Sequence, residues 1–142
     1  MLNELITQAI KQHDFTEVKS NSKDIYFFKK EQGELRRYII TYGSNILENA
    51  SNINELIINN TPVEILESPA FAKDTDLIIV FQLDKLSNYK QYEKSIFDIE
   101  ENAYHFKKYV LYYSNEENQL ISGKNFSDLK AVLSDHEEFS IF

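Results

Sequence analysis

The sequence predicts an α+β fold, in which helices pack on a mostly antiparallel β-sheet. Three observations carry this prediction. The first residues form an amphipathic helical pattern, the segment 24–42 holds two aromatic, β-branched runs around a turn, and the run LIIVF is continuously apolar. With 142 residues and 42% hydrophobic content, residues 1–142 suffice for a single domain with its own core. We expect the order α-β-β-β-α-β-α-β-α.

The first part of the chain predicts one helix and three strands. FTEVKSNS predicts a short strand, and DIYFFKK and LRRYIITY predict two longer ones. The polar EQGE between the longer strands contains Gly33, which suits a turn with positive φ, so the three strands form an antiparallel meander. The helix before them is indicated by apolar side chains at helical spacing: Leu2, Leu5, Ile6, Ala9 and Ile10.

The second part predicts alternating helices and strands. NINELIINN predicts a short helix with Asn52 as its N-cap, and TPVEILESPAF predicts one or two helical turns between prolines. DLIIVFQLD predicts a central strand covered on both faces, KKYVLYY a later strand, and residues 126–133 a last helix capped by Asn125. Between the two strands, Ser87 is expected to cap a helix whose inward face holds Tyr89, Tyr92, Ile96, Phe97 and Ile99.

Charge and composition limit the classes of function. The net charge is −8, and the deficit falls on residues 45–142, which carry eight Lys/Arg against seventeen Asp/Glu. An acidic body argues against stand-alone, non-specific nucleic-acid binding and is compatible with a basic protein partner. The absence of cysteine excludes disulfides, Cys-based zinc sites and thiol nucleophiles.

The sequence also shows the pattern of neither a signal peptide nor a membrane-spanning segment. The first residues lack the basic start and uninterrupted apolar stretch of a signal peptide. The longest apolar run elsewhere, LIIVF, is far short of the roughly 20 residues needed to span a bilayer. We therefore expect a cytoplasmic protein that does not contact a membrane.

No motif indicates catalysis, a metal or a cofactor, so we expect a non-enzyme. The histidines show no metal-ligand spacing, and the three glycines form no phosphate-binding loop. Glu100 and Glu101 are adjacent on a helix, so they point about 100° apart and do not form an acid–base pair. The strongest enzyme alternative is a restriction-endonuclease-like nuclease, since Glu17 and Lys19 match half of its metal site, but no acidic strand precedes them.

Basic pairs support a different alternative, contact with nucleic acid. Lys29/Lys30 and Arg36/Arg37 lie at the ends of predicted neighbouring strands with aromatics close by, a combination that suits single-stranded nucleic acid. Successive strand residues face opposite sides, so one residue of each pair points away from the other. The competing interpretation, which we prefer, is that the aromatics form the core and the charges its rim.

Two blocks are more specific than composition, FAKDTDLIIV at 71–80 and IEENAYHFKKYVLYY at 99–113. With them the chain resembles the middle component of bacterial ABC-three-component defence systems, and the small subunit of the related Lamassu-type systems. Asp74 departs from the family pattern, which often has Asn there. The residues that match are Phe71, Lys73, Thr75 and Leu77 in the first block, and Ile99, Glu100, Glu101, Tyr104, Phe106, Lys107, Lys108, Tyr109 and Val110 in the second.

The resemblance implies a non-catalytic adaptor or regulatory subunit in an antiviral complex. Its partners would be an SMC/Rad50-like ABC ATPase and an effector, often a nuclease, and it would meet DNA only through the complex. The end of the chain offers one more candidate contact, because Phe139, Ile141 and Phe142 are apolar and follow several acids. They would either complete the core or insert into a groove of a partner.

The second block also predicts a structural corner between a helix and a strand. We expect Tyr104 and Phe106 to be buried there. We also expect Glu100 or Glu101 to reach back to Lys107 or Lys108, since a partly buried ion pair fixes geometry more than it adds stability. Lys73 and Asp76 are assigned a similar role at the start of the central strand.

Overall fold

The computed structural model describes residues 2–102, 104–114 and 119–120, and it confirms the α+β fold. All described strands belong to one six-stranded sheet with the order β1-β2-β3-β4-β5-β6. The predicted helix at 126–133 and the apolar residues Phe139, Ile141 and Phe142 lie outside the described residues. The elements are α1 (Leu2–Gln12), β1 (Thr16–Val18), β2 (Ile25–Gln32), β3 (Leu35–Ser44), α2 (Ala50–Asn60), α3 (Val63–Leu66), β4 (Thr75–Leu83), the 3₁₀ turn η1 (Leu86–Asn88), α4 (Tyr89–Glu101), β5 (Lys107–Ser114) and β6 (Gln119–Leu120).

The predicted meander is confirmed for β1, β2 and β3, which pair antiparallel. Gln32 pairs with Leu35, so Gly33 and Glu34 form a two-residue turn between the strands. Gly33 has a φ of 60°, a left-handed conformation that costs glycine little because it has no Cβ. The turn residue identified in the sequence therefore has the backbone geometry expected of it.

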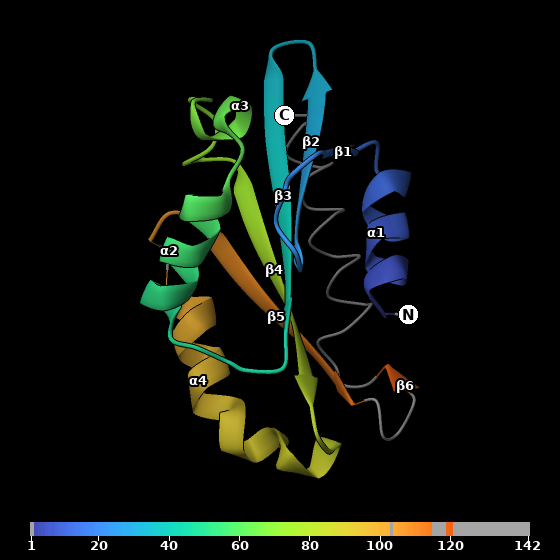
Figure 1. The fold of residues 1–142 in the computed structure, drawn as a ribbon, viewed down its shortest axis with the longest axis vertical. Helices are drawn as coiled ribbons and strands as arrows, with labels where there is room; N and C mark the ends of the chain where they lie inside the picture. Colours follow the sequence, from blue (N-terminus) through green and yellow to red (C-terminus); the bar gives the residue numbers. More distant parts are fainter. Residues whose placement is uncertain (1, 103, 115–118, 121–142) are drawn as a thin grey trace.

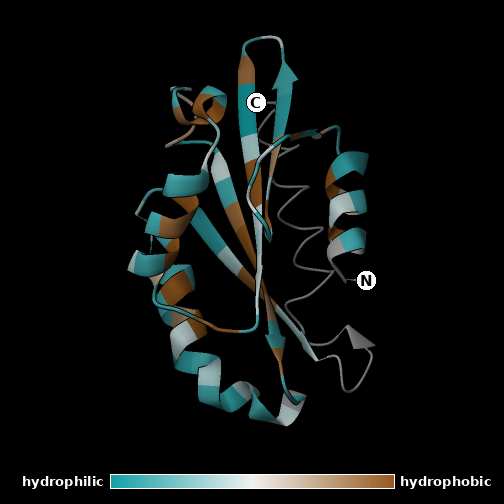
Figure 2. Ribbon diagram, in the orientation of Figure 1, coloured by the Kyte–Doolittle hydropathy of each residue, from teal (hydrophilic) through white to brown (hydrophobic). Residues whose placement is uncertain are grey.

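The rest of the sheet combines two parallel pairings with one antiparallel pairing. β4 runs parallel to β3 and to β5, whereas β5 and β6 pair antiparallel. Parallel neighbours need a crossover connection, and here helices supply both crossovers. Figure 1 shows α2, α3 and α4 on one side of the sheet, which we call the helical face, and α1 on the other, the α1 face. The fold thus has three layers, and in Figure 2 hydrophobic colour lies on the sides of the helices toward the sheet.

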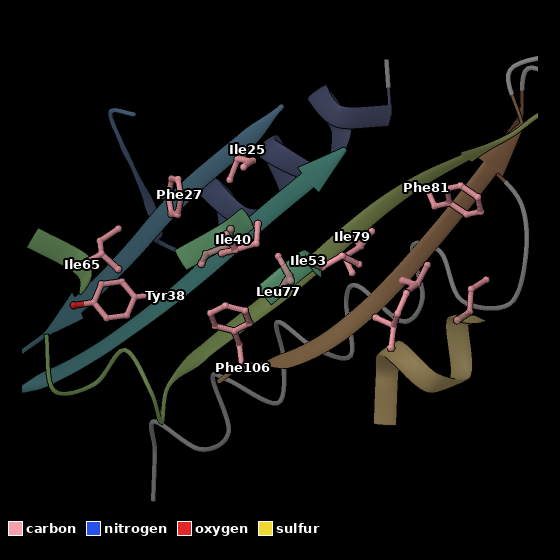
Figure 3. Close-up of a cluster of buried hydrophobic side chains, with 14 of the residues drawn as sticks. Ile25, Phe27, Tyr38, Ile40, Ile53, Ile65, Leu77, Ile79, Phe81 and Phe106 are labelled. Atoms are coloured by element: carbon pink, nitrogen blue, oxygen red, sulfur yellow. The ribbon is translucent and has the colours of Figure 1, made fainter. Parts of the chain in front are cut away.

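Strand alternation divides the apolar side chains into two clusters. The larger lies on the helical face, and Figure 3 shows Phe27, Ile40 and Leu77 from three neighbouring strands within it. The smaller joins Ile6 and Ile10 of α1 to the opposite face of the same strands. β4 contributes Leu77, Ile79 and Phe81 to the first cluster and Ile78 and Val80 to the second, so the prediction of a central strand covered on both faces is confirmed.

Three local predictions are wrong. The N-cap of α2 is Asn49 rather than Asn52, and Asn49 Oδ1 accepts a hydrogen bond from the Asn52 backbone N–H. Ser87 lies inside η1, so it does not cap α4; that position belongs to Asn88. Phe97 is exposed because it falls about 100° beyond Ile96, outside the stripe that Ile96 and Ile99 bury. β6 was not predicted, since two residues carry too little pattern.

We predict that Ile57→Ala destabilises the protein by about 2–4 kcal/mol, because Ile57 is fully buried between α2 and the sheet and its truncation leaves a cavity. Urea unfolding followed by circular dichroism measures the change. Ile46→Ala removes the same atoms from a side chain that is 66% exposed and should change stability by less than about 0.5 kcal/mol. Equal effects of the two substitutions would contradict the assignment of α2 to the core.

Candidate functional site

The two sequence blocks come together at one end of the sheet. Phe71 and Phe106 are both buried, and their rings pack edge to face with centroids 5.8 Å apart. The register of β4 and β5 pairs Asp76 with Lys107 and Leu77 with Lys108. Residues 102 and 104–108, which we call the corner, lie between α4 and β5 or at the start of β5. Segments about thirty residues apart therefore form one structural unit.

The centre of the corner is the ammonium group of Lys108, a residue only 1% exposed. Its three N–H donors are shared among four neutral oxygens within hydrogen-bond distance of Nζ: Asn102 O at 3.1 Å, Asn102 Oδ1 at 3.0 Å, Tyr104 O at 2.8 Å and Phe106 O at 3.0 Å. Nζ also lies 5.3 Å from the centroid of the Phe106 ring. Of the two lysines expected to pair with a glutamate, Lys108 does not, because backbone carbonyls and one side-chain amide oxygen accept its hydrogen bonds instead. The alternative pairing through Lys107 stays a prediction.

The charge of Lys108 is held at the end of a helix. Asn102 is the C-cap of α4, and the last turn of that helix contains no basic residue. The carbonyl end of a helix carries partial negative charge and favours a cation. Burial lowers the pKa of Lys108 from 10.5 to about 8, which leaves the ammonium form predominant at neutral pH. Lys108 therefore supplies from β5 the cation that the last turn of α4 lacks.

Asn102 connects this lysine to the rest of the helical layer. Its Oδ1 also accepts from the Tyr104 backbone N–H at 3.2 Å and from Asn54 Nδ2, on α2, at 3.4 Å. Asn54 is itself buried. The network thus ties α2, α4 and β5 together, and a substitution in it acts on three elements at once.

His105 completes the corner with an unusual backbone. Its φ is 73°, in the left-handed region that non-glycine residues rarely adopt. Burial, and then the charge of Lys108, lower the pKa of His105, which favours a neutral imidazole. Its ring packs against that of Tyr104 with centroids 4.0 Å apart. The Tyr104 side chain is 69% exposed, so the expectation that it is buried is wrong, whereas Phe106 is buried as expected.

Glu100 reaches the backbone of β5. Its Oε2 accepts a hydrogen bond from the Val110 N–H at 3.0 Å. In the described residues, β6 pairs only with Tyr113 and Ser114. The carboxylate therefore occupies a donor on the part of the β5 edge that β6 does not cover, which protects that edge from other strands.

The remaining residues of the two blocks are distributed over both faces. Asp76 is buried on the α1 face, next to Lys107 in the strand register. Lys107 Nζ lies 5.5 Å from the ring centroid of Tyr109. Ile99 is buried in the core of the helical face. Lys73 and Glu101 are exposed, and neither belongs to the corner network.

The two basic pairs are split between the faces of the hairpin, as strand alternation predicts. Lys30 and Arg37 are paired across β2 and β3 on the α1 face and are both buried, with Lys30 Nζ 5.6 Å from the Phe15 ring centroid. Lys29 Nζ lies 3.7 Å from Glu31 and 3.9 Å from Glu64. Arg36 Nη1 donates to the Gly33 carbonyl at 2.8 Å. The four cations therefore lie two on each face and do not form one basic strip.

The part of the chain that the structure describes has no group of three or more His, Cys, Asp or Glu placed to hold a metal ion. Glu17, the acid of the nuclease alternative, lies 3.8 Å from Lys11 on α1. None of the described helices is long and apolar enough to cross a membrane.

Sequence reasoning missed a polar hollow of about 520 Å³ at the carboxyl ends of the parallel strands β3, β4 and β5. Ligands of open sheets with parallel strands bind at this end, but the rule applies only once parallel pairing is known. Within the hollow, the Tyr113 hydroxyl lies 3.4 Å from Gln82 Oε1, and burial raises the pKa of that tyrosine. Its polar lining includes Ser22, Asp24, Ser44, Asn60, Gln82 and Tyr113.

We predict that Lys108→Met lowers the free energy of unfolding by about 2–4 kcal/mol, because the Phe106 carbonyl loses a buried hydrogen bond and the Asn102 and Tyr104 carbonyls lose their bonds to the ammonium group. Lys107→Met, at the exposed neighbouring position, is the matched control and should cost less than about 1 kcal/mol. Chemical denaturation at pH 7 compares them. A Lys108→Met variant as stable as the wild type would refute the role assigned to this ammonium group.

The same pair of proteins tests the pKa of Lys108. The folded pKa of about 8 lies below the unfolded value of 10.5, so between these limits the unfolded chain binds more protons. Stability contributed by this group must then rise with pH. The difference in free energy of unfolding between the wild type and Lys108→Met should therefore increase between pH 8 and pH 10. All other titrating groups are common to both proteins, so their effects cancel in this difference. A constant or falling difference would contradict the lowered pKa.

Comparison with known proteins places these residues in a family. The family model described as ABC-three component (ABC-3C) system Middle Component 1 matches residues 25–137, well over half of the chain. The match begins at the first residue of β2 and includes the corner. Among curated proteins and among solved structures, no significant match was found.

Proposed function

Because this chain belongs to the Middle Component 1 family of ABC-three component systems, we propose that it is a non-catalytic adaptor subunit of an antiviral defence complex. A middle component is one component of a system that contains further components, so this chain is expected to have partner subunits. In our proposal, the chain links an SMC/Rad50-like ABC ATPase, as in Lamassu-type systems, to an effector, and it does so by protein–protein contacts in the cytoplasm. The family match is the observation that carries this proposal.

The arrangement of the corner supports a role without chemistry. A catalytic lysine needs a free amine directed at a substrate, whereas the Lys108 ammonium donates to oxygens of its own chain. Glu100, the carboxylate beside it in the sequence block, accepts from the backbone of β5. These groups are engaged in holding the corner, which suits a scaffold that presents a fixed surface.

The distribution of charge supports a basic partner. The two crossover segments on the helical face, residues 45–74 and 84–106, carry ten Asp/Glu against four Lys. That excess of six negative charges accounts for most of the chain's net charge of −8. A surface of one sign speeds and orients association with a surface of the opposite sign.

The second candidate function is contact with nucleic acid inside the complex. The partly exposed cations on β2 and β3, Lys29 and Arg36, favour it, but Glu31 lies close to both, and Glu64 lies close to Lys29 as well. We rank this function below the adaptor for that reason. A restriction-endonuclease-like nuclease ranks third.

We predict that the chain co-purifies with the ATPase subunit of its own system and hydrolyses no nucleotide by itself. Co-expression of a tagged chain with that ATPase, followed by affinity and size-exclusion chromatography, tests assembly. A phosphate-release assay on the isolated chain tests turnover. If the isolated chain is monodisperse and binds neither the ATPase nor the effector, the adaptor proposal fails.

We predict that a Lys29→Glu/Arg36→Glu variant assembles normally, because the proposed adaptor function relies on the acidic side chains of the helical face and not on these two cations. Lys30 and Arg37 are left unchanged, since charge reversal at buried positions would unfold the hairpin. DNA binding by the assembled complex is measured at two salt concentrations. A loss of salt-sensitive binding with intact assembly would favour the nucleic-acid function instead.

A further inference from the structure

Two aromatic side chains remain outside the core at the end of α4 and in the corner. Phe97 is 60% exposed and Tyr104 is 69% exposed. Most other described phenylalanines are buried in one of the two core clusters. Exposed aromatics are the residue type that contributes most to binding energy at protein interfaces. Their position within the family match makes them candidates for contact with another subunit.

Carboxylates surround Phe97 on the same helix. Glu93, Phe97 and Glu101 follow each other at intervals of four residues, so they share one face of α4. Asp98 is exposed next to Phe97. The last turn contains three acids and no base, an arrangement that the helix dipole disfavours.

These acids are not used within the described fold. Glu100 accepts the Val110 N–H, but Asp98 and Glu101 take part in none of the ion pairs found among the described residues. Placing negative charge at the negative end of a helix dipole costs stability. Lys108 offsets this cost at the Asn102 carbonyl, but it forms no ion pair with Asp98 or Glu101 among the described residues. Local sequence choices that do not serve the fold itself are expected at functional surfaces.

The backbone around Tyr104 is fixed although its side chain is exposed. The Tyr104 N–H donates to Asn102 Oδ1, and the Tyr104 carbonyl accepts from Lys108 Nζ. The ring lies against that of His105, whose φ of 73° directs the chain through the corner. Because the residue is already ordered, a partner that binds it loses less conformational entropy.

We propose that the exposed face of α4 and the corner form a docking surface for an arginine-bearing segment of a partner subunit. We call this surface the acidic aromatic face and define it by Glu93, Phe97, Asp98, Glu101 and Tyr104. A guanidinium group stacks on aromatic rings and pairs with carboxylates, so arginine satisfies both features of the surface, whereas an apolar partner would leave the acids unpaired. This inference rests on the adaptor function and specifies the surface that performs it.

The test uses the intact complex, reconstituted from the chain, the ATPase and the effector of the same system. A Phe97→Ala/Tyr104→Ala variant should bind its partner at least roughly tenfold more weakly, since aromatic contacts dominate interface energy. Val63→Ala/Leu66→Ala, which truncates two exposed aliphatic residues of α3, is the matched control and should bind as the wild type does. Circular dichroism confirms that each variant is folded.

Charge reversal provides a second, independent measurement. Asp98→Arg/Glu101→Arg should weaken binding and reverse its salt dependence, and the same change at the exposed acids of the adjacent helical region, Glu48→Arg/Glu55→Arg, should have less effect. Full binding by both acidic-aromatic-face variants, with a wild-type complex that forms, would overturn the docking surface but leave the adaptor function intact. A wild-type chain that binds neither subunit would instead refute the adaptor function.

Discussion

The structure depends on one buried cation at the junction of a helix and a strand. Lys108 begins on β5, yet its ammonium group serves the end of α4, where Asn102 caps the helix. The side chain passes through the corner, and three backbone carbonyls turn toward it. The bond to the Phe106 carbonyl is buried, and leaving a buried carbonyl without a donor costs about 1–3 kcal/mol. The lysine thereby determines the path of the chain between the two elements.

That path sets the register of the parallel part of the sheet. β5 must enter next to β4 with Lys107 opposite Asp76, and the corner delivers it there. The edge-to-face contact of Phe71 and Phe106 closes the same end, since Phe71 belongs to the segment that leads into β4. Because Asn102 also bonds Asn54, the position of α2 is linked to that of α4. One polar network therefore positions both crossovers on the helical face.

The sequence predicted the strongly periodic elements and their faces, because local pattern determines them. α1, the Gly33 hairpin and the fully covered β4 each follow from spacing alone. The roles within the corner did not follow, since they depend on distance in three dimensions. The pattern predicts that Glu100 or Glu101 pairs with Lys107 or Lys108, but Glu100 and Lys108 each have a backbone partner that sequence spacing does not reveal. Hydrophobicity predicts an inward Phe97, but its angle on the helix places it outside the Ile96–Ile99 stripe.

The same cation explains how an acidic helix end is tolerated. Asp98, Glu100 and Glu101 repel one another and the carbonyl end of α4, so alone they would promote fraying of the last turn. Lys108 places positive charge at the carbonyl end of that turn, and the Glu100 carboxylate is bound to the Val110 N–H. The remaining acids point outward beside Phe97, over a helix end that is stabilised from within. The positive charge of Lys108 therefore stabilises the fold from inside, and the negative charges of Asp98 and Glu101 are available to a partner at the surface. A neutral residue in place of Lys108 would affect the stability of the fold and also partner binding, because without the internal cation the last turn of α4, which presents the acids, would fray.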